Sequence, residues 1–505
     1  MITPDHFKPY APDLHAVVRL DVALPPDHTV HVFVDLIQGV SLDHFVVPSS
    51  AQGEKPYHPH ALFGILCWGY LHGVHSSRNL ARLARQEATF VYLAGGGAPN
   101  FRTLARFRRE NAEAFTAIFQ ETVLLALRLG LVRLGHVALD GTKFKANSSK
   151  HKAMRYGRMQ QREAQLKAES AALVAQAEAQ DARDDAAYGV STDGSAVAEE
   201  LTRREARLAK IQALRERLEA ERREAQGLTE AETPTIDAKE QRSFADADAR
   251  IMLLKTGAYD YAYNAQAAVD DAAGVIIAAS LTNCAPATGH LPALVADVRV
   301  LRGAAALPAT AETTVSADAG YFSADNIAAD GDGIDLLIAA GRGDLPARPA
   351  VGHVYTADCF AYDASRDVWL CPADKVLERQ LSPAGTTGRP SKHRYLAVPS
   401  DCAACPLRAH CLKSGEERRV LVTQRSRTTG GMRLKLRQPD ARRRYARRKV
   451  IVEPIFGQLK QDRGFSALHL RGLVYARGEF LLACLAHNLG KLLRVCALPA
   501  VQQSA

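Results

Sequence analysis

The apolar residues recur with a helical period over most of residues 25–130. The segment PHALFGILCWGYLHG (59–73) is apolar on most faces, which is typical of a buried helix. The next segment, SSRNLARLARQEATFVYLAGG, begins with two serines that can cap a helix and continues as an amphipathic run. The segment NFRTLARFRRENAEAFTAIFQETVLLALRLG (100–130) repeats this design. We therefore expect an all-α N-terminal domain over residues 1–130.

Arginines gather in the first turns of the last of these segments, at positions 102, 106, 108 and 109. A basic helix face is compatible with a DNA-binding module of the helix-turn-helix type, in which Arg102 and Arg106 contact the DNA. A solvated helix face explains the same charges equally well, so both interpretations stay open.

Strand-like runs follow the helical region. HVALD (136–140) is a short apolar strand that ends in an acid, and YAYNAQAAVDDAAGVIIAASLTN (261–283) has two β-rich runs around a turn, as an antiparallel hairpin would. ETTVSADAGYFSADNI (312–327) is again an apolar strand that ends in an acid, and GIDLLIAAG (333–341) is one more strand. The pattern predicts a region of the α/β class.

A change of composition interrupts this α/β region. Residues 155–226 are dominated by Ala, Glu, Arg, Gln and Leu, with a Gly/Ser/Asp-containing break at AAYGVSTDGSA (186–196). We expect two antiparallel helices, the second with an apolar stripe at Leu201, Leu208, Ile211, Leu214 and Leu218. Such a coiled-coil hairpin would serve dimerisation or DNA contact, and a spacer packed on its own domain is the alternative.

Composition and charge narrow the class of protein. A chain of 505 residues exceeds what one core usually organises, and its net charge of +9 favours polyanionic partners. No segment approaches the roughly 20 apolar residues of a membrane span, and the first residues do not resemble a secretion signal. We therefore expect a cytoplasmic protein that has no membrane partner.

The two acids that end strands, Asp140 and Asp318, suggest a metal site. Carboxylates at neighbouring strand ends suit two Mg²⁺ or Mn²⁺ ions that assist phosphoryl transfer, and a third carboxylate usually completes the set. Glu453 is the candidate, because it lies in a basic segment and precedes Lys460 by two helical turns. Pro454 places Glu453 either at a helix start or at a kink. Taken alone, each acid is more often a turn or cap residue.

Four of the nine cysteines lie close enough in the sequence to suggest a second metal site. Cys371 lies in WLCPADK, and Cys402, Cys405 and Cys411 lie in DCAACPLRAHC, so that a tetrahedral Cys₄ zinc site is possible. Reduced cysteines without a ligand are the alternative.

Several of these segments together resemble a DDE transposase of a bacterial insertion sequence. They are PYHPHALFGILCWGYLHGVHSSRNLARLARQEATFVYLAGG with NFRTLARFRR, then VALDGTKFKANSSK, YNAQAAVD, ADAGYFS, VEPIFGQLK, and LRGL with AHNLGKLLR. They occur in the order of the family and span nearly the whole chain. The resemblance implies an RNase H-like mixed sheet with flanking helices, preceded by an all-α N-terminal domain and interrupted by the helical hairpin.

The resemblance also implies the active residues. Asp140, Asp318 and Glu453 match the three family acids, which bind two Mg²⁺ or Mn²⁺ ions, and Lys460 keeps the family spacing from Glu453. In related transposases an arginine stands four residues before this glutamate; here Lys449 occupies that position, Arg448 is its neighbour, and Tyr445 lies one residue too far upstream. We expect the DNA backbone to be held by Arg448, Lys449, Lys143, Lys145, Asn147 and Lys150.

The implied function is transposition: the protein binds the terminal inverted repeats of its element and joins them to target DNA. Its partner is double-stranded DNA, on which a homodimer forms near the bacterial nucleoid. The expected domains are 1–130, a catalytic core over 131–345 that is interrupted by the hairpin at 151–245, a cysteine-bearing insertion with the possible zinc at 346–420, and a basic helical part at 421–505. An RNase H-like nuclease without strand transfer and an inactive DNA-binding descendant are the alternatives.

Overall fold

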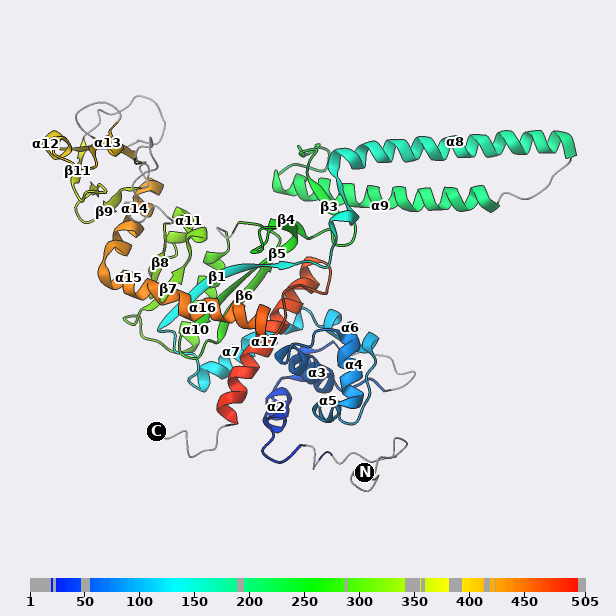
Figure 1. The fold of residues 1–505 in the computed structure, drawn as a ribbon, viewed down its shortest axis with the longest axis horizontal. Coiled ribbons are helices and arrows are strands. Elements are labelled where there is room, and N and C mark those ends of the chain that lie inside the picture. The colour runs from blue at the N-terminus through cyan, green and yellow to red at the C-terminus, as the bar shows by residue number, and fades with distance from the viewer. Residues whose placement is uncertain are drawn as a thin grey trace, which may run out of the picture.

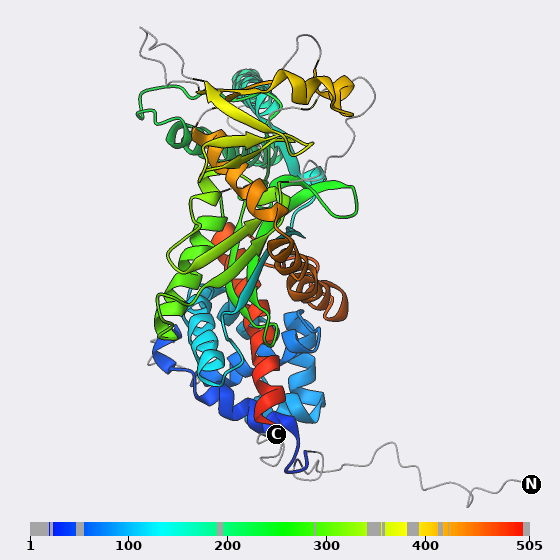
Figure 2. The ribbon, with the colours of Figure 1, turned by 90° about the vertical axis from the view of Figure 1, so that its left-hand side faces the viewer.

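The computed structural model describes Leu20, residues 24–46, 55–188, 195–286 and 289–340, Tyr355, and residues 359–380, 393–412, 418–422 and 424–497. A mixed sheet lies at the centre of the elongated molecule, with the N-terminal helices at one end (Figures 1 and 2). A second sheet and a long helical hairpin extend from the opposite end. The expected α/β class with an all-α N-terminal part is confirmed.

The N-terminal part is helical because its apolar residues recur at helical spacing. Its helices are α2 (Thr29–Gln38), α3 (Pro59–Leu71), α4 (Ser77–Gln86), α5 (Ala88–Leu93), α6 (Phe101–Glu110) and α7 (Ala114–Arg128). The apolar α3 is buried over most of its length. Asn100 caps α6, since its side chain accepts hydrogen bonds from the backbone N–H groups of Arg102 and Thr103, both at 2.9 Å.

The central sheet is mixed, with both parallel and antiparallel neighbours. Its strands are β1 (His136–Lys145), β4 (Arg250–Leu253), β5 (Tyr259–Asp270), β6 (Ile276–Thr282), β7 (Thr313–Ala317) and β8 (Ile334–Ile338). β4 and β6 pair with β5 antiparallel, β5 pairs with β1 antiparallel, and β1, β7 and β8 are parallel neighbours. This topology confirms the mixed sheet that the resemblance implied.

The C-terminal helix α17 (Leu473–Cys496) joins the sheet to the N-terminal helices, because it packs against β6, α7 and α3 (Figure 2). Its buried Asn488 exchanges two hydrogen bonds with the backbone of Ile276, at 2.8 and 2.9 Å. Gly478 lets α17 approach the N-terminal helices closely, since a Cβ there would lie 2.5 Å from Ala112. Helices α10 (Leu291–Ala304) and α16 (Arg448–Gly457) also pack against strands of the sheet.

The predicted helical hairpin is present. It consists of α8 (Tyr156–Tyr188) and α9 (Ser195–Ala225), which lie side by side and extend far from the sheet (Figure 1). Of the expected stripe, Ile211, Leu214 and Leu218 are buried. Of the break expected at 186–196, residues 189–194 lie outside the described residues, and the flanking residues belong to the two helices. Two short strands, β2 (Ala153–Arg155) and β3 (Gln241–Ser243), close the base of the hairpin.

The cysteine-bearing region contains a second, antiparallel sheet that the sequence did not predict. Its strands are β9 (Ala361–Asp363), β10 (Val368–Leu370), β11 (Val376–Gln380), β12 (His393–Ala397) and β13 (Arg419–Val422). The short helices α12 (Pro399–Ala403) and α13 (Arg408–Cys411) lie between β12 and β13 in the sequence. Trp369, Tyr395 and Phe360 form its small core. The strands have only three to five residues, too few for an alternating pattern to appear in the sequence.

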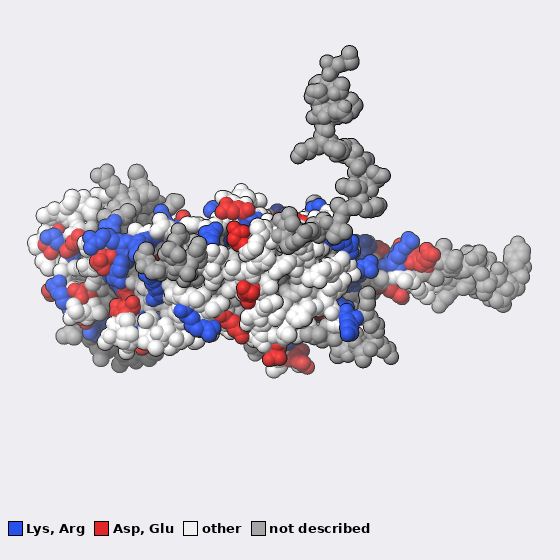
Figure 3. All heavy atoms as spheres, turned by 90° about the horizontal axis from the view of Figure 1, so that it is seen from below, with Lys and Arg blue, Asp and Glu red and all other residues white. Residues whose placement is uncertain are grey.

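Basic helices connect this second sheet to the central sheet. They are α14 (Gln424–Arg437) and α15 (Pro439–Ala446), and lysine and arginine side chains gather toward their end of the molecule in Figure 3. The middle of the same face is largely uncharged. Among the helices that the structure describes, none combines the length and the apolar character that crossing a membrane would require.

Candidate active site

Asp140 and Asp318 lie at adjacent positions of two parallel strands. The register pairs Leu139 of β1 with Ala317 of β7, so Asp140 and Asp318 are the next residues along the chain. Asp318 directly follows the end of β7, as expected, but the expectation that the first strand ends at Asp140 is wrong, because its pairing with β5 extends β1 to Lys145. Each carboxylate accepts a local backbone hydrogen bond: Asp140 from the N–H of Gly141 at 2.8 Å, and Asp318 from the N–H of Gly320 at 3.0 Å. Asp318 therefore caps the short 3₁₀-helical turn Ala319–Tyr321 and also lies beside Asp140, which itself is in a strand and not in a turn.

Arg448 links the first acid to the third. Its guanidinium lies 3.5 Å from Oδ2 of Asp140 and 3.5 Å from Oε1 of Glu453, so one arginine forms ion pairs with both acids. Arg448 is buried, whereas Lys449 is exposed. Arg448 therefore stands at the acids, although Lys449 occupies the position at which the family motif has its arginine. Tyr445 interacts with Arg448, so that the tyrosine and arginine of the motif remain together.

The charges of the three acids act on one another. Burial raises the pKa of Asp140, and the negative charges of Asp318 and Glu453 raise it further. The N–H of Gly141 and the positive charge of Arg448 lower the same pKa. A buried carboxylate whose ionisation two neighbouring acids disfavour is one that a cation would stabilise.

Lys460 contacts the strand that carries Asp140. It follows α16 in a π-helical segment (Gln458–Asp462), and its Nζ donates to Oγ1 of Thr142 at 2.6 Å and to the carbonyl of Lys143 at 2.7 Å. Burial, together with the charge of Lys255, lowers the pKa of Lys460 to about 8. Pro454 lies inside α16, so Glu453 is neither a cap nor the first helical residue.

A buried polar group behind the acids was not found from the sequence. Gln266 on β5 accepts a hydrogen bond from the hydroxyl of Tyr321, and its amide donates to Oδ1 of Asn264 at 2.7 Å. A Cβ at Gly141 would lie 2.5 Å from Oε1 of Gln266, so glycine is the residue that fits there. The only signal in the sequence was the alternation in YNAQ, which places Asn264 and Gln266 on one face of the strand.

The residues that follow Asp140 differ in their surroundings. Nζ of Lys143 donates to the carbonyl of Ala285 at 2.7 Å, and burial lowers the pKa of Lys143 to about 8, although the charge of Asp318 opposes this. Lys145 forms an ion pair with Asp260 at 3.0 Å. Asn147 donates to the carbonyl of His469 at 2.5 Å, while Lys150 is exposed.

The arginines of α6 divide into two groups. Arg102 is exposed and lies against the ring of Phe101, and Arg106 is exposed with an ion pair to Glu110 at 3.7 Å. Arg108 is buried, and its guanidinium donates to the hydroxyl of Tyr70 at 2.8 Å. Only the exposed group is available to a partner.

The four cysteines of the possible zinc site line one cavity of about 30 Å³. Backbone N–H groups of Ala373 and Lys375 donate to Sγ of Cys371, each at 3.3 Å. Burial raises the pKa of the Cys371 and Cys411 thiols, and the neighbouring cysteines act in the same direction. Within the described part of the chain, no three His, Cys, Asp or Glu side chains are already arranged to hold a metal ion, at this cavity or at the acids.

Two family models match the chain. Residues 18–110 match a transposase domain (DUF772), and residues 370–493 match a transposase DDE domain. The second match includes Glu453 and Lys460, whereas Asp140 and Asp318 lie between the two matched segments. No curated protein and no solved structure matches the chain.

Proposed function

We propose that this chain, whose residues 18–110 and 370–493 match transposase family models, is a DDE transposase of an insertion sequence that cuts DNA at the ends of its element and joins the released ends to target DNA. The observation that carries this proposal is that Asp140, within β1, and Asp318, directly after the parallel strand β7, lie side by side, with Arg448 connecting Asp140 to Glu453. The three acids and Lys460 would be the catalytic residues.

The acids suit two Mg²⁺ or Mn²⁺ ions, because they are oxygen ligands whose charges repel one another. Bound ions of this kind activate the attacking oxygen and stabilise the leaving one. Arg448 offsets part of the acids' charge in the absence of ions. When ions and DNA bind, its guanidinium is free to move from Asp140 and contact a phosphate, for which its planar fork is well suited.

The chain's own residues would position the DNA for two successive displacements. In the first, water attacks the phosphodiester at the element boundary and the 3′-oxygen leaves as a hydroxyl. In the second, this hydroxyl attacks a target phosphodiester and a target 3′-oxygen leaves. Lys460 holds the segment of β1 beside Asp140 through Thr142 and Lys143, and its ammonium can neutralise a phosphate at the same place.

Sequence recognition requires contacts beyond the acids, since phosphate contacts do not read bases. The exposed Arg102 and Arg106 of α6 would contact the terminal inverted repeats. An element has two ends, so a homodimer assembled on double-stranded DNA would be the working unit, located at the bacterial nucleoid. Lys145, Lys150 and Lys449 would add phosphate contacts, whereas the internal hydrogen bond of Asn147 suits a structural role.

The test is cleavage and joining of a labelled duplex that carries the element end, with Mg²⁺ and a target plasmid. Asp318→Asn should abolish both steps while DNA binding persists, because it removes one ligand charge. Asp332→Asn is the matched control: Asp332 is an aspartate whose side chain is 92% exposed, and asparagine tolerates its positive φ of 51°. Cutting that persists in Asp318→Asn would contradict the assignment of the site.

The same assay separates the alternatives. Cleavage without joining would support a nuclease, and binding without cleavage by the parent would support an inactive descendant.

A structural zinc ion held by Cys371, Cys402, Cys405 and Cys411 is the second metal we propose. The four sulfurs surround one cavity, and two N–H groups directed at Sγ of Cys371 stabilise a thiolate there. Zinc binding would draw the sulfurs together.

The purified parent should contain about one zinc per chain by elemental analysis. Cys405→Ser should lose it, and Cys284→Ser, at an exposed cysteine outside the cavity, should retain it. Parent protein without zinc, with all four thiols freely titrating, would contradict the proposal.

A further inference from the structure

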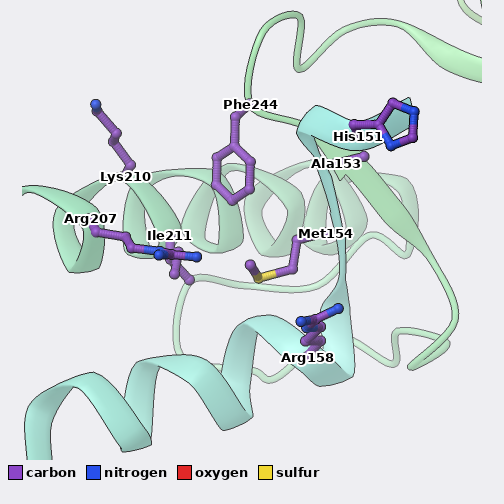
Figure 4. Close-up of a pocket in the computed structure, with 8 residues that line it drawn as sticks. All are labelled: His151, Ala153, Met154, Arg158, Arg207, Lys210, Ile211 and Phe244. Carbon is purple, nitrogen blue, oxygen red and sulfur yellow. The ribbon is translucent and has the colours of Figure 1, made fainter. Parts of the chain in front are cut away.

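A cationic pocket lies at the base of the helical hairpin, apart from the three acids (Figure 4). Its volume is about 340 Å³, and it lies between α8, α9, strand β2 and Phe244, which directly follows β3. Arg158 comes from α8, while Arg207 and Lys210 come from α9. Figure 4 shows the ring of Phe244 standing in the middle of this opening, above Met154.

The cations of this pocket differ from the other basic residues of the hairpin. Arg204, Arg215 and Arg222 each form ion pairs with glutamates at 2.8 to 3.3 Å. In contrast, none of Arg158, Arg207 and Lys210 forms an ion pair or side-chain hydrogen bond with any described residue. The pocket lining contains no carboxylate. Three grouped positive charges without a counter-charge repel one another, and an anion would relieve this repulsion.

The apolar lining restricts which anion fits. Phe244 is 39% exposed although it is a large aromatic side chain, and its ring has Met154 and buried Ile211 as neighbours in the pocket. Cations around an exposed ring match a nucleotide of a single strand, whose phosphates meet the cations while its base stacks on the ring. The volume suits a small group and excludes an intact duplex.

The pocket also lies on a continuous path from the acids. β1 carries Asp140 and ends at Lys145, and the chain reaches His151 at the pocket edge shortly afterwards. The exposed Lys150 and Lys152 flank His151. Positive side chains therefore accompany the chain from the acids to the hairpin base.

We propose that this pocket binds an unpaired nucleotide of the DNA strand that leaves the active site, with its base on Phe244 and its phosphates at Arg158, Arg207 and Lys210. The inference rests on the proposed function, which supplies DNA as the anion. It gives the hairpin a role in holding locally unpaired DNA.

The test uses the full chain and a fluorescent reporter in the pocket. The two native tryptophans, Trp68 and Trp369, are buried, so Phe244→Trp places an exposed tryptophan at the proposed stacking position. A single-stranded oligothymidylate should quench this fluorescence, and heparin, a polyanion without bases, should not. Quenching that is absent with the oligonucleotide, or equal with heparin, would overturn base stacking in this pocket.

The affinity for the oligothymidylate, measured by fluorescence anisotropy, provides a second readout. The variants change exposed side chains of the pocket. The double variant Arg207→Ala with Lys210→Ala should bind roughly tenfold more weakly. The slope of log affinity against log salt concentration should become shallower by about 0.7 for each phosphate contact that is lost. Phe244→Leu should also lose roughly tenfold, because it keeps an apolar side chain but not a stacking ring. Arg203→Ala is the matched control: Arg203 is a 74%-exposed arginine one turn before Arg207, and its removal should have little effect.

The outcomes separate the pocket from the active site. If the parent cleaves duplex ends but the pocket variants bind like the parent, the pocket proposal fails while the proposed function stands. If the parent binds no DNA of any kind, the proposed function fails and the pocket proposal fails with it. Weakened single-strand binding in the pocket variants, with the Asp318→Asn variant binding normally, supports the pocket independently of catalysis.

Discussion

The buried carboxylate of Glu479 should contribute strongly to stability, because it connects α17 to the N-terminal helices. It accepts hydrogen bonds from the hydroxyl of Tyr70 at 2.8 Å and from the backbone N–H groups of His469 and Leu470, both at 2.8 Å, and lies 3.4 Å from Arg108. Its side chain is fully buried. We predict that Glu479→Gln destabilises this part of the protein.

The magnitude follows from the pKa. Burial disfavours the ionised form of Glu479, yet the hydrogen bond with the His469 imidazole, whose Nδ1 lies 2.9 Å from Oε1 of Glu479, and the charge of Arg108 hold its pKa at about 2, below the ordinary value of 4.5. A difference of about 2.5 pKa units corresponds to about 3 kcal/mol. Since the folded-state pKa is depressed, this stability is fully present above pH 4.5 and is lost as the pH falls toward 2.

The assay is urea unfolding near neutral pH, followed by the fluorescence of Trp68 on α3 in a background in which Trp369 is replaced by phenylalanine. Glu479→Gln should lower the unfolding free energy of this transition by about 3 kcal/mol, an order-of-magnitude value for a buried ion pair that loses one partner. The control variant Glu110→Gln removes the carboxylate of the surface ion pair with Arg106 and should change the unfolding free energy by less than about 1 kcal/mol. Equal stability of the parent and Glu479→Gln would refute the reasoning.

The remaining predictions concern the candidate active site. Cleavage should decline as the pH rises through about 8, because Lys460 then loses its charge, and Lys460→Arg should shift this decline to higher pH in a pH–rate profile. Gly141→Ala should lower both the melting temperature and cleavage, since its Cβ would displace Gln266 at a cost of about 1 to 3 kcal/mol. Arg448→Ala should reduce cleavage at least tenfold, whereas Lys449→Ala, which changes an exposed side chain, should have a much smaller effect; equal losses would contradict the assignment of Arg448.

The elements that the sequence predicted well are those with long, regular patterns. The helical period over residues 25–130 and the change of composition at 155–226 identified the N-terminal helices and the hairpin. Asp140 and Asp318 were visible as acids after apolar runs, and the parallel pairing of β1 and β7 sets them side by side, although β1 continues past Asp140 to Lys145 instead of ending there.

Other features depend on tertiary contacts that leave no local pattern. One residue along a helix turns a side chain by about 100°, so the sequence could not decide between Arg448 and Lys449. Gln266 was missed because a buried polar residue in a strand is distinguished only by its partner, here Tyr321 from a distant segment. The amide of Asn147, a residue that we expect at DNA, donates to the carbonyl of His469, and the sequence did not reveal this contact because His469 is remote along the chain.

The central claim is that Asp140, Asp318 and Glu453 form one metal-binding centre, and iron-mediated cleavage of the protein backbone tests it most directly. Fe²⁺ takes the place of Mg²⁺ at oxygen ligands, and hydroxyl radicals generated there with ascorbate and peroxide cut the nearby chain. Fragment analysis should show cuts near all three acids, suppressed together by excess Mg²⁺ and by Asp318→Asn. Cuts near only one acid, or cuts that Asp318→Asn leaves unchanged, would show that the three acids do not share a metal site.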